Sequence, residues 1–294
     1  MHAYENYPEQ HGNVSYGIDE KGNVGHFKTP TPGEPNGDSI SGFLADTKFS
    51  IDRGIFSEPF HVAITTASEG ANIRFTTDGS VPTLTNGTDY PGGDGIRIET
   101  TTTLRVAAFK NGFEPTNVDT HTYVFPDAIV EQPERPDGFP TSWTGWDYEM
   151  DADPDDLPAI AGDENLSQQA AKAAIADSLR ALPTMSIVMN VDDLFGRPDG
   201  IYFNTEGRGD RWERAASVEI IHSDGSSQNY QGDCGIRMQG FTSRNPGRNP
   251  KHSLRLIFRR AYGDGKMRYP LFSEDAAREF DTIVLRSNSQ DAWV

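Results

Sequence analysis

Two stretches decide the fold: residues 70–83, GANIRFTTDGSVPT, and residues 101–110, TTTLRVAAFK. In both, apolar side chains alternate with small or polar ones. Successive side chains of a strand point to opposite faces, so this period of two predicts strands with one buried face. Turn pairs such as Asp78-Gly79 and Asn111-Gly112 separate the strands and favour an antiparallel β-sandwich. The alternating runs are residues 60–64, 73–76, 96–98, 104–109 and 120–125.

The same two stretches resemble the chitobiase/hexosaminidase C-terminal-type β domain. The resemblance implies an Ig-like fold for residues 44–125 and an accessory role within a larger protein. No catalytic grouping stands out among residues 44–125. Asp78 lies in a Thr-Asp-Gly-Ser turn and is expected to bond the backbone, as Asp does in Asx turns. His61 and His121 lie within predicted strands with no partner histidine at ligand spacing, so we expect structural roles for both.

The composition limits the remaining possibilities. The 294 residues include 29 Gly and 19 Pro with 35% hydrophobic residues, which indicates a loop-rich, mainly β protein with some α-helix, of more than one domain. A formal net charge of −18 argues against nucleic acid as a partner. The single cysteine, Cys234, excludes an intramolecular disulfide, and no apolar run is long enough for a membrane span.

The N-terminal residues 1–36 contain short alternating runs and end in the proline-rich segment 29–36, TPTPGEPN. Prolines at this density remove ladder donors and predict the exit from a domain. Together with residues 14–17, VSYG, this segment resembles the end of a lamin-tail-type domain. The beginning lacks the features of a signal peptide, and a strand is expected only eight residues before Val294. We therefore expect the sequence to be a piece of a longer protein.

Residues 126–164 are predicted to be an acidic, proline-rich linker, with twelve acids against one base. The acidic run at 151–156 fails as an EF-hand, because loop positions six and twelve are Asp156 and Gly162. The aromatic residues Trp143, Trp146 and Tyr148 are expected to pack this linker onto a neighbouring domain, with sugar stacking as the alternative.

From residue 165 onward the pattern changes. Residues 165–182 are predicted to form a helix, because Ile175, Leu179 and Leu182 are spaced at helical intervals and Pro183 follows. We expect this helix to pack near the start of a β-rich layer. The strands of that layer are predicted at residues 185–189, 200–203, 216–221, 234–238, 253–258 and 282–285.

The charge is unevenly distributed, because residues 236–294 carry eleven bases and six acids. Residues 240–248, GFTSRNPGR, form a polar loop between two predicted strands, and Lys251 follows at the entrance of the second strand. A loop over phosphates with a strand-borne lysine is typical of kinase nucleotide sites, although no Walker A or ordinary glycine-rich kinase motif is present. The alternative is that these bases balance acidic surface elsewhere.

A second resemblance covers residues 184–294. Residues 193–202, 212–220, 235–240 and 251–258 resemble the opening of a CotH-type (spore coat protein H-like) kinase domain. This implies that residues 165–294 form the β-rich N-terminal part of an atypical protein kinase fold, with ATP and Mg as cofactors of the complete domain. Lys251 matches the lysine after the polar loop and is the first candidate for a phosphate contact; Arg237 and Arg255 are the others. The resemblance places the catalytic and metal-binding carboxylates beyond Val294.

Other candidate residues are weaker. Cys234 has no histidine near it in sequence and is expected to be a buried residue rather than a nucleophile. Glu213 and Glu219 are expected to lie on different elements or faces, and no glycosidase signature is present.

Two hypotheses follow from the sequence. The first is a fragment of an extracellular or cell-surface bacterial CotH-like protein that acts on a protein substrate and is inactive as cut. The second is a non-enzymatic surface or adhesion protein whose β domains bind polysaccharide or cell wall.

Overall fold

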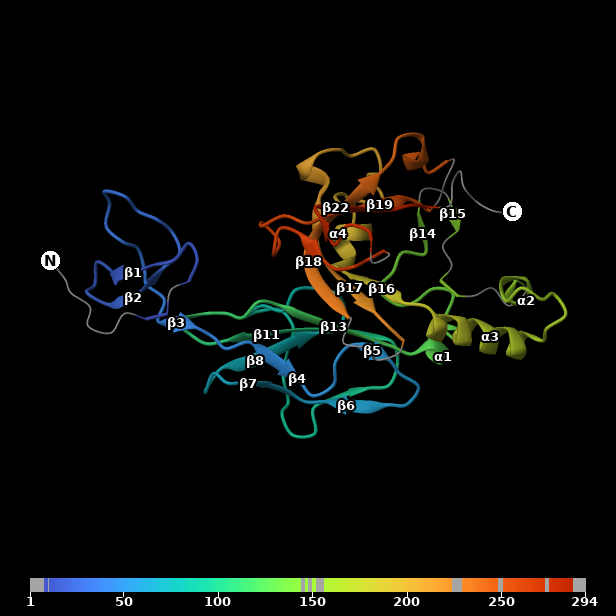
Figure 1. The fold of residues 1–294 in the computed structure, drawn as a ribbon, viewed down its shortest axis with the longest axis horizontal. Coiled ribbons are helices and arrows are strands. Elements are labelled where there is room, and N and C mark those ends of the chain that lie inside the picture. Colours follow the sequence, from blue (N-terminus) through green and yellow to red (C-terminus); the bar gives the residue numbers. More distant parts are fainter. Residues whose placement is uncertain are drawn as a thin grey trace.

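The computed structural model describes residues 8–9, 11–143, 146–147, 150–151, 156–223, 229–247, 251–272 and 275–287. Within these ranges the chain forms a small N-terminal β-unit, a β-sandwich and a second β-sheet that lies against the sandwich (Figure 1). The predicted mainly β composition with a few helices is confirmed. Every helix in the described part is too short or too polar to cross a membrane.

The N-terminal unit is a β-hairpin with an added bridge. Asp19 closes the hairpin turn, because its carboxylate accepts hydrogen bonds from the backbone N and Nδ2 of Asn23 at 2.7 and 2.9 Å. An isolated bridge pairs His26 with Ile40. The short alternating runs of residues 1–36 form strands, while the lamin-tail resemblance stays a prediction. The elements are β1 (Ser15–Ile18), β2 (Val24–Phe27) and β3 (Gly42–Phe43), the last paired in parallel with β12 (Phe113–Glu114).

The β-sandwich consists of a five-stranded layer facing two short strand pairs (Figure 1). The five-stranded layer runs in the order β5 (Gly54–Ile55), β13 (Asp119–Val124), β11 (Thr102–Phe109), β8 (Asn72–Thr76) and β9 (Thr88–Asp89). The facing pairs are β4 (Thr47–Phe49) with β7 (Ile64–Thr66), and β6 (Phe60–Val62) with β10 (Ile96–Ile98). The predicted sandwich and its strands are therefore confirmed, except that the run 60–64 is divided at Ala63 between β6 and β7.

The sandwich core contains the apolar residues of the alternating runs. Leu104 and Val106 of β11 are fully buried, as is Tyr123 of β13, whose hydroxyl donates to the carbonyl of Ile51 at 2.9 Å. Val62, Ile64 and Ile98 from the facing pairs complete this core. Burial of this kind contributes about 25 cal/mol for each Å² of apolar surface.

The acidic linker is not extended throughout. α1 (Pro126–Ile129) and α2 (Leu157–Ile160) each form one helical turn, with proline in the first positions, where its missing N–H costs nothing. β14 (Ser142–Trp143) pairs with β15 (Trp146–Asp147). The predicted packing of Trp143, Trp146 and Tyr148 concerns side chains outside the described residues.

The predicted helix is present as α3 (Gln168–Ala181). Ser167 caps its N-terminus by accepting a hydrogen bond from the backbone N of Ala170 at 3.2 Å. However, the helix packs against α1 and α2 rather than on the second sheet, as Figure 1 shows. Lys172 pairs with Glu131 at 2.6 Å, and a second ion pair joins Arg180 to Asp127. These two ion pairs hold the linker residues Asp127 and Glu131 against α3.

The second sheet is five-stranded and entirely antiparallel. One face carries the buried core residues Val218, Ile236 and Leu256. α4 (Val191–Phe195) packs on this core through Leu194 and Phe195. The strands, in sheet order, are β16 (Thr184–Val188), β17 (Arg214–Ile221), β18 (Tyr230–Gln239), β19 (Ser253–Ile257) and β22 (Thr282–Leu285). A separate short pair is β20 (Met267–Arg268) with β21 (Glu279–Phe280).

The strand predicted at residues 200–203 is wrong. This segment is a turn, because the backbone N–H groups of Ile201 and Tyr202 donate to the carbonyls of Asp193 and Leu194 in α4. The Nδ2 of Asn204 closes the turn by donating to the carbonyls of Pro198 and Gly200. Ile201 and Tyr202 are both buried, but they lie under α4 and not in the sheet.

The other face of the second sheet meets the sandwich through polar side chains. Glu219 of β17 is fully buried and accepts a hydrogen bond from the backbone N of Thr122 in β13 at 3.1 Å. The Thr122 hydroxyl also contacts the Glu219 carboxylate and lies 2.8 Å from the hydroxyl of Ser186 in β16. Arg53 pairs with Glu219 at 3.2 Å. The sandwich and the sheet are therefore joined by buried charge and hydrogen bonds.

Candidate functional site

A groove of about 410 Å³ lies on the face of the second sheet that also meets the sandwich, at the end carried by β18, β19 and β22. The predicted polar loop forms one side of the groove and includes a short 3₁₀ turn, Thr242–Arg244. Hydroxyl groups dominate the lining. The lining residues are Gln239, Gly240, Phe241, Thr242, Ser243, Ser253, Val284, Arg286 and Ser287.

The loop is held in place by a buried arginine. Arg244 is only 7% exposed, and its guanidinium donates to the carbonyls of Thr205, Gly207 and Met238 at 3.3, 2.8 and 2.7 Å. Because its guanidinium donates to backbone carbonyls, Arg244 stabilises the loop and is not a candidate for binding an anion in the groove. Hydrogen bonds to a charged donor are among the stronger ones, at about 1.5–3 kcal/mol each.

Two further contacts fix the loop. Nδ1 of the buried His252 lies 3.1 Å from the carbonyl of Ser243, and burial lowers the pKa of His252. Gly240 has a φ of +112°, and a Cβ there would lie 2.1 Å from the hydroxyl of Ser243. Only glycine fits this position, since a side chain would meet both strain and a clash. The loop is therefore preformed over the groove.

Arg237 and Arg255 lie directly opposite each other on adjacent strands. Directly paired residues share a face, so both belong to the grooved face, and Val284 of the groove is the cross-strand partner of Arg255 on the other side. Nε of Arg255 is buried without a hydrogen-bond partner, and the structure shows no ion pair of this residue within the described part of the chain. A buried donor of this kind is rare in native proteins and calls for a ligand, water or ion.

Arg237 is in a different situation, because it already has acidic neighbours. Its Nη1 lies 3.6 Å from Asp210 and 3.7 Å from Glu213, and Arg259 approaches the same two carboxylates at 3.2 and 3.4 Å. The Glu213 side chain is almost fully buried over Gly235, where a Cβ would lie 2.5 Å from its Oε1. For Arg237, the structure therefore supports the alternative of charge balance.

Lys251 is exposed and lies two residues before β19, at the entrance predicted for it. It is not among the residues that line the groove. Arg248, the last residue of the predicted loop, and the acid Asp291 lie outside the described residues. The hydroxyls of Ser253 and Ser287, 3.1 Å apart, were not predicted as site residues. Alternation along 253–258 could have indicated Ser253, whereas Ser287 is positioned only by the pairing of β22 with β19.

The remaining sequence candidates have structural roles. Asp78 accepts hydrogen bonds from the backbone N and hydroxyl of Ser80 at 3.0 and 2.6 Å, which confirms the turn predicted for it. Cys234 is buried as predicted, and burial raises the pKa of its thiol to about 12, so it carries no thiolate at neutral pH. Glu213 and Glu219 form separate contacts, with Arg237 and Arg259 in one case and with Thr122 and Arg53 in the other.

The potential for metal binding is limited in the part of the chain that the structure describes. In these ranges no three histidine, cysteine, aspartate or glutamate side chains lie close enough together to hold a metal ion.

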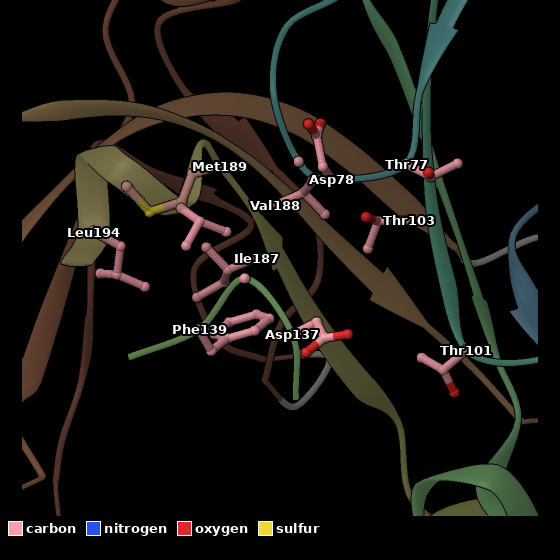
Figure 2. Close-up of a pocket in the computed structure, with 13 residues that line it drawn as sticks. Thr77, Asp78, Thr101, Thr103, Asp137, Phe139, Ile187, Val188, Met189 and Leu194 are labelled. Atoms are coloured by element: carbon pink, nitrogen blue, oxygen red, sulfur yellow. The ribbon is translucent and has the colours of Figure 1, made fainter. Parts of the chain in front are cut away.

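A second cleft, of about 420 Å³, lies where the sandwich, the linker and the second sheet meet (Figure 2). The sandwich contributes residues 77–79 together with Thr101 and Thr103. The linker contributes residues 137–139, and the segment from β16 to α4 provides the rest of the wall. That wall consists of Ile187, Val188, Met189, Val191 and Leu194.

Comparisons with known proteins bear on the sandwich. Residues 51–120 match the family model of the chitobiase/beta-hexosaminidase C-terminal domain. No curated protein and no solved structure matches the chain. Residues 51–120, which include most of the strands of the sandwich, are therefore similar to the chitobiase/beta-hexosaminidase C-terminal domain, as predicted from residues 70–83 and 101–110.

Proposed function

We propose that the groove on the second sheet binds the phosphate groups of a nucleotide, with ATP as the expected ligand. The observation that carries this proposal is the buried, unpartnered Nε of Arg255 beside a groove roofed by a preformed polar loop. A guanidinium suits phosphate oxygens, because its planar fork of donors can bind two of them at once.

The surroundings of Arg255 favour an anion. Arg255 is not itself among the residues that line the groove, but its cross-strand partner Val284 is. Arg286 also lines the groove, together with the hydroxyls of Ser243, Ser253 and Ser287. Hydroxyl groups can donate to phosphate oxygens without adding charge. Residues 236–294 carry an excess of bases within an acidic protein. An anion would therefore be attracted to this region and repelled from most of the remaining surface.

The wider proposal is that the chain is part of an extracellular or cell-surface CotH-like protein, an atypical kinase that transfers phosphate to a protein substrate. The resemblance of residues 184–294 supports it. Phosphoryl transfer also needs carboxylates that hold Mg. The described residues supply no such group, so the proposal for this chain covers nucleotide binding and no chemical step.

The nucleotide proposal predicts a specific loss of affinity. Changing Arg255 to Met keeps the length of the side chain and removes the charge and the donors. We expect the Kd for a fluorescent ATP analogue to rise about 10- to 150-fold, because one charge-assisted hydrogen bond contributes about 1.5–3 kcal/mol. Titration with the analogue, monitored by fluorescence anisotropy, measures this.

Arg97→Met is the matched control, since Arg97 lies on the sandwich and pairs with the exposed Glu99. It should leave the affinity unchanged, and thermal unfolding of both variants checks that each is folded. If the wild-type protein does not bind the analogue, or if a folded Arg255→Met protein binds it as tightly as wild type, the groove is not a phosphate site.

The alternative function is polysaccharide binding by the sandwich of a non-enzymatic surface protein. One observation favours it: an open groove of about 590 Å³ at one end of the sandwich, lined in part by Leu84, which is 72% exposed, and by Phe113. Binding of the full chain to a glycan array, lost on changing Phe113 to Ala and retained on changing Arg255 to Met, would support this alternative over the first proposal.

A further inference from the structure

The cleft of Figure 2 lies at the contact between the sandwich and the second sheet, and fixed backbone contacts form part of its lining. Gly79 has a φ of +79°, and a Cβ there would lie only 2.3 Å from the carbonyl oxygen of Met189. The buried Arg105 donates from Nη1 to the carbonyl of Gly79 at 3.0 Å. The backbone that lines the cleft is thus held from both sides, so a ligand would meet an existing cavity.

One wall of the cleft is apolar. Figure 2 shows Ile187, Met189 and Leu194 along this side, with the ring of Phe139 beside Ile187. Phe139 is 36% exposed, and its ring packs against that of Phe195 at a centroid distance of 6.2 Å. These side chains leave an apolar surface open to solvent that the alkyl part of a ligand could cover.

The rest of the lining offers acceptors and negative charge. Figure 2 shows Asp78 and Asp137 at opposite ends of the cleft, with Thr103 between them in this view. None of the described lining residues is Lys, Arg or His. The bonds to Ser80 use only Oδ1 of Asp78, and these bonds lower the pKa of its carboxyl. Asp137 forms no hydrogen bond or ion pair within the described residues and is exposed.

We propose that this cleft binds a primary ammonium group carried on an apolar stem. Because the described lining holds two carboxylates and no cationic side chain, the cleft is expected to repel anions and attract a cation. Threonine hydroxyls can accept the remaining ammonium protons, and the apolar wall suits the aliphatic stem. The volume lies within the range of about 300–1,000 Å³ that is usual for small-ligand sites. A lysine side chain has this chemistry, whereas an amino sugar shares only the ammonium group, and the site is independent of the groove beside Arg255.

The test uses the full chain and three amine probes: 1,5-diaminopentane, Nα-acetyl-lysine amide and glucosamine. We expect chemical-shift changes in the backbone amides of Thr101, Thr103 and Gly138, with a Kd at least about five-fold weaker in Asp137→Asn. Raising the ionic strength should weaken binding in the wild type and have less effect in the variant. Asp94→Asn, at an exposed aspartate of the sandwich, is the control and should bind like wild type.

Each outcome either identifies the class of ligand or contradicts the proposed site. Binding of Nα-acetyl-lysine amide without glucosamine assigns the cleft to lysine side chains. Binding of glucosamine without the lysine probe would show that the cleft does not select an apolar stem, which contradicts the proposal. Binding of all three probes supports any primary ammonium. The proposal is overturned if no probe shifts these amides, if N-acetylglucosamine binds as well as glucosamine, or if Asp94→Asn weakens binding as much as Asp137→Asn.

Discussion

Changing Glu219 to Ala is expected to lower the free energy of unfolding by about 3–5 kcal/mol, as is usual when one partner of a buried ion pair is removed. Glu219 is fully buried and accepts from the backbone N and the hydroxyl of Thr122. Its loss leaves Arg53, whose side chain is only 13% exposed, without its carboxylate at 3.2 Å. Urea unfolding monitored by circular dichroism measures the change.

Two companion variants sharpen this test. Glu99→Ala removes an ion pair whose two side chains are 59% and 60% exposed, and it should cost less than about 1 kcal/mol. The double variant Arg53→Met with Glu219→Leu removes both charges and should be more stable than Glu219→Ala alone. If Glu219→Ala costs no more than Glu99→Ala, the buried contact does not join the sandwich to the sheet as the structure indicates.

The strands were predictable because burial on one face leaves a period of two in the sequence. Residues 104–109 and 120–125 show it, and their apolar side chains are those of the sandwich core. This pattern does not show whether the opposite face of these strands is exposed to solvent or buried against another element. Thr120 and Thr122 have the polarity of a solvated face, yet both are buried, Thr122 against Glu219. A polar side chain that meets water and one that meets a buried carboxylate look alike in a single sequence.

The candidate site was predictable to a similar extent. The excess of bases after residue 236 and the predicted loop between two strands pointed to the segment that lines the groove, while its role in binding stays a prediction. Which bases are already paired depends on strand register and on segments distant in sequence: Asp210 and Glu213 reach Arg237, whereas Arg244 binds the carbonyls of Thr205 and Gly207. Arg255 stands out only after these pairings are known.

The segment 200–203 shows where the local pattern fails. Ile201 and Tyr202 are buried, as residues of a strand can be, but their backbone N–H groups donate to the carbonyls of Asp193 and Leu194 in α4. Burial can be inferred from hydrophobicity, whereas the hydrogen-bond partner of a buried backbone depends on the tertiary structure.

A large pH effect is expected from His121. This residue is 7% exposed, stacks on Phe49 at a centroid distance of 3.8 Å, and has a buried Nδ1 without a hydrogen-bond partner. Burial, and secondarily the charge of Arg53, lower its pKa from 6.5 to about 3. Between these two values the unfolded chain binds a proton that the folded protein does not. The contribution of His121 to stability is therefore complete above pH 6.5 and is lost as the pH falls toward 3.

The expected size follows from about 1.4 kcal/mol for each unit of pKa difference, which amounts to about 3 kcal/mol between pH 6.5 and pH 4. His121→Phe keeps an aromatic ring on Phe49 and removes the titrating group. Between pH 6.5 and pH 4, the free energy of unfolding of this variant should therefore fall by about 3 kcal/mol less than that of the wild type. Urea unfolding at both pH values measures the difference, and His61→Phe, at an exposed position of β6, is the control.

The comparison isolates His121 because the other titrating groups are common to all three proteins. Burial raises the pKa of Glu219, Asp119 and Asp233, which opposes acid destabilisation, but these carboxyls contribute equally to wild type and variants. Equal losses in wild type and His121→Phe would show that His121 is protonated in the folded state. Since its ring lies flat on Phe49 with an interplanar angle of 5°, a charge there would then need a partner that the described residues do not supply.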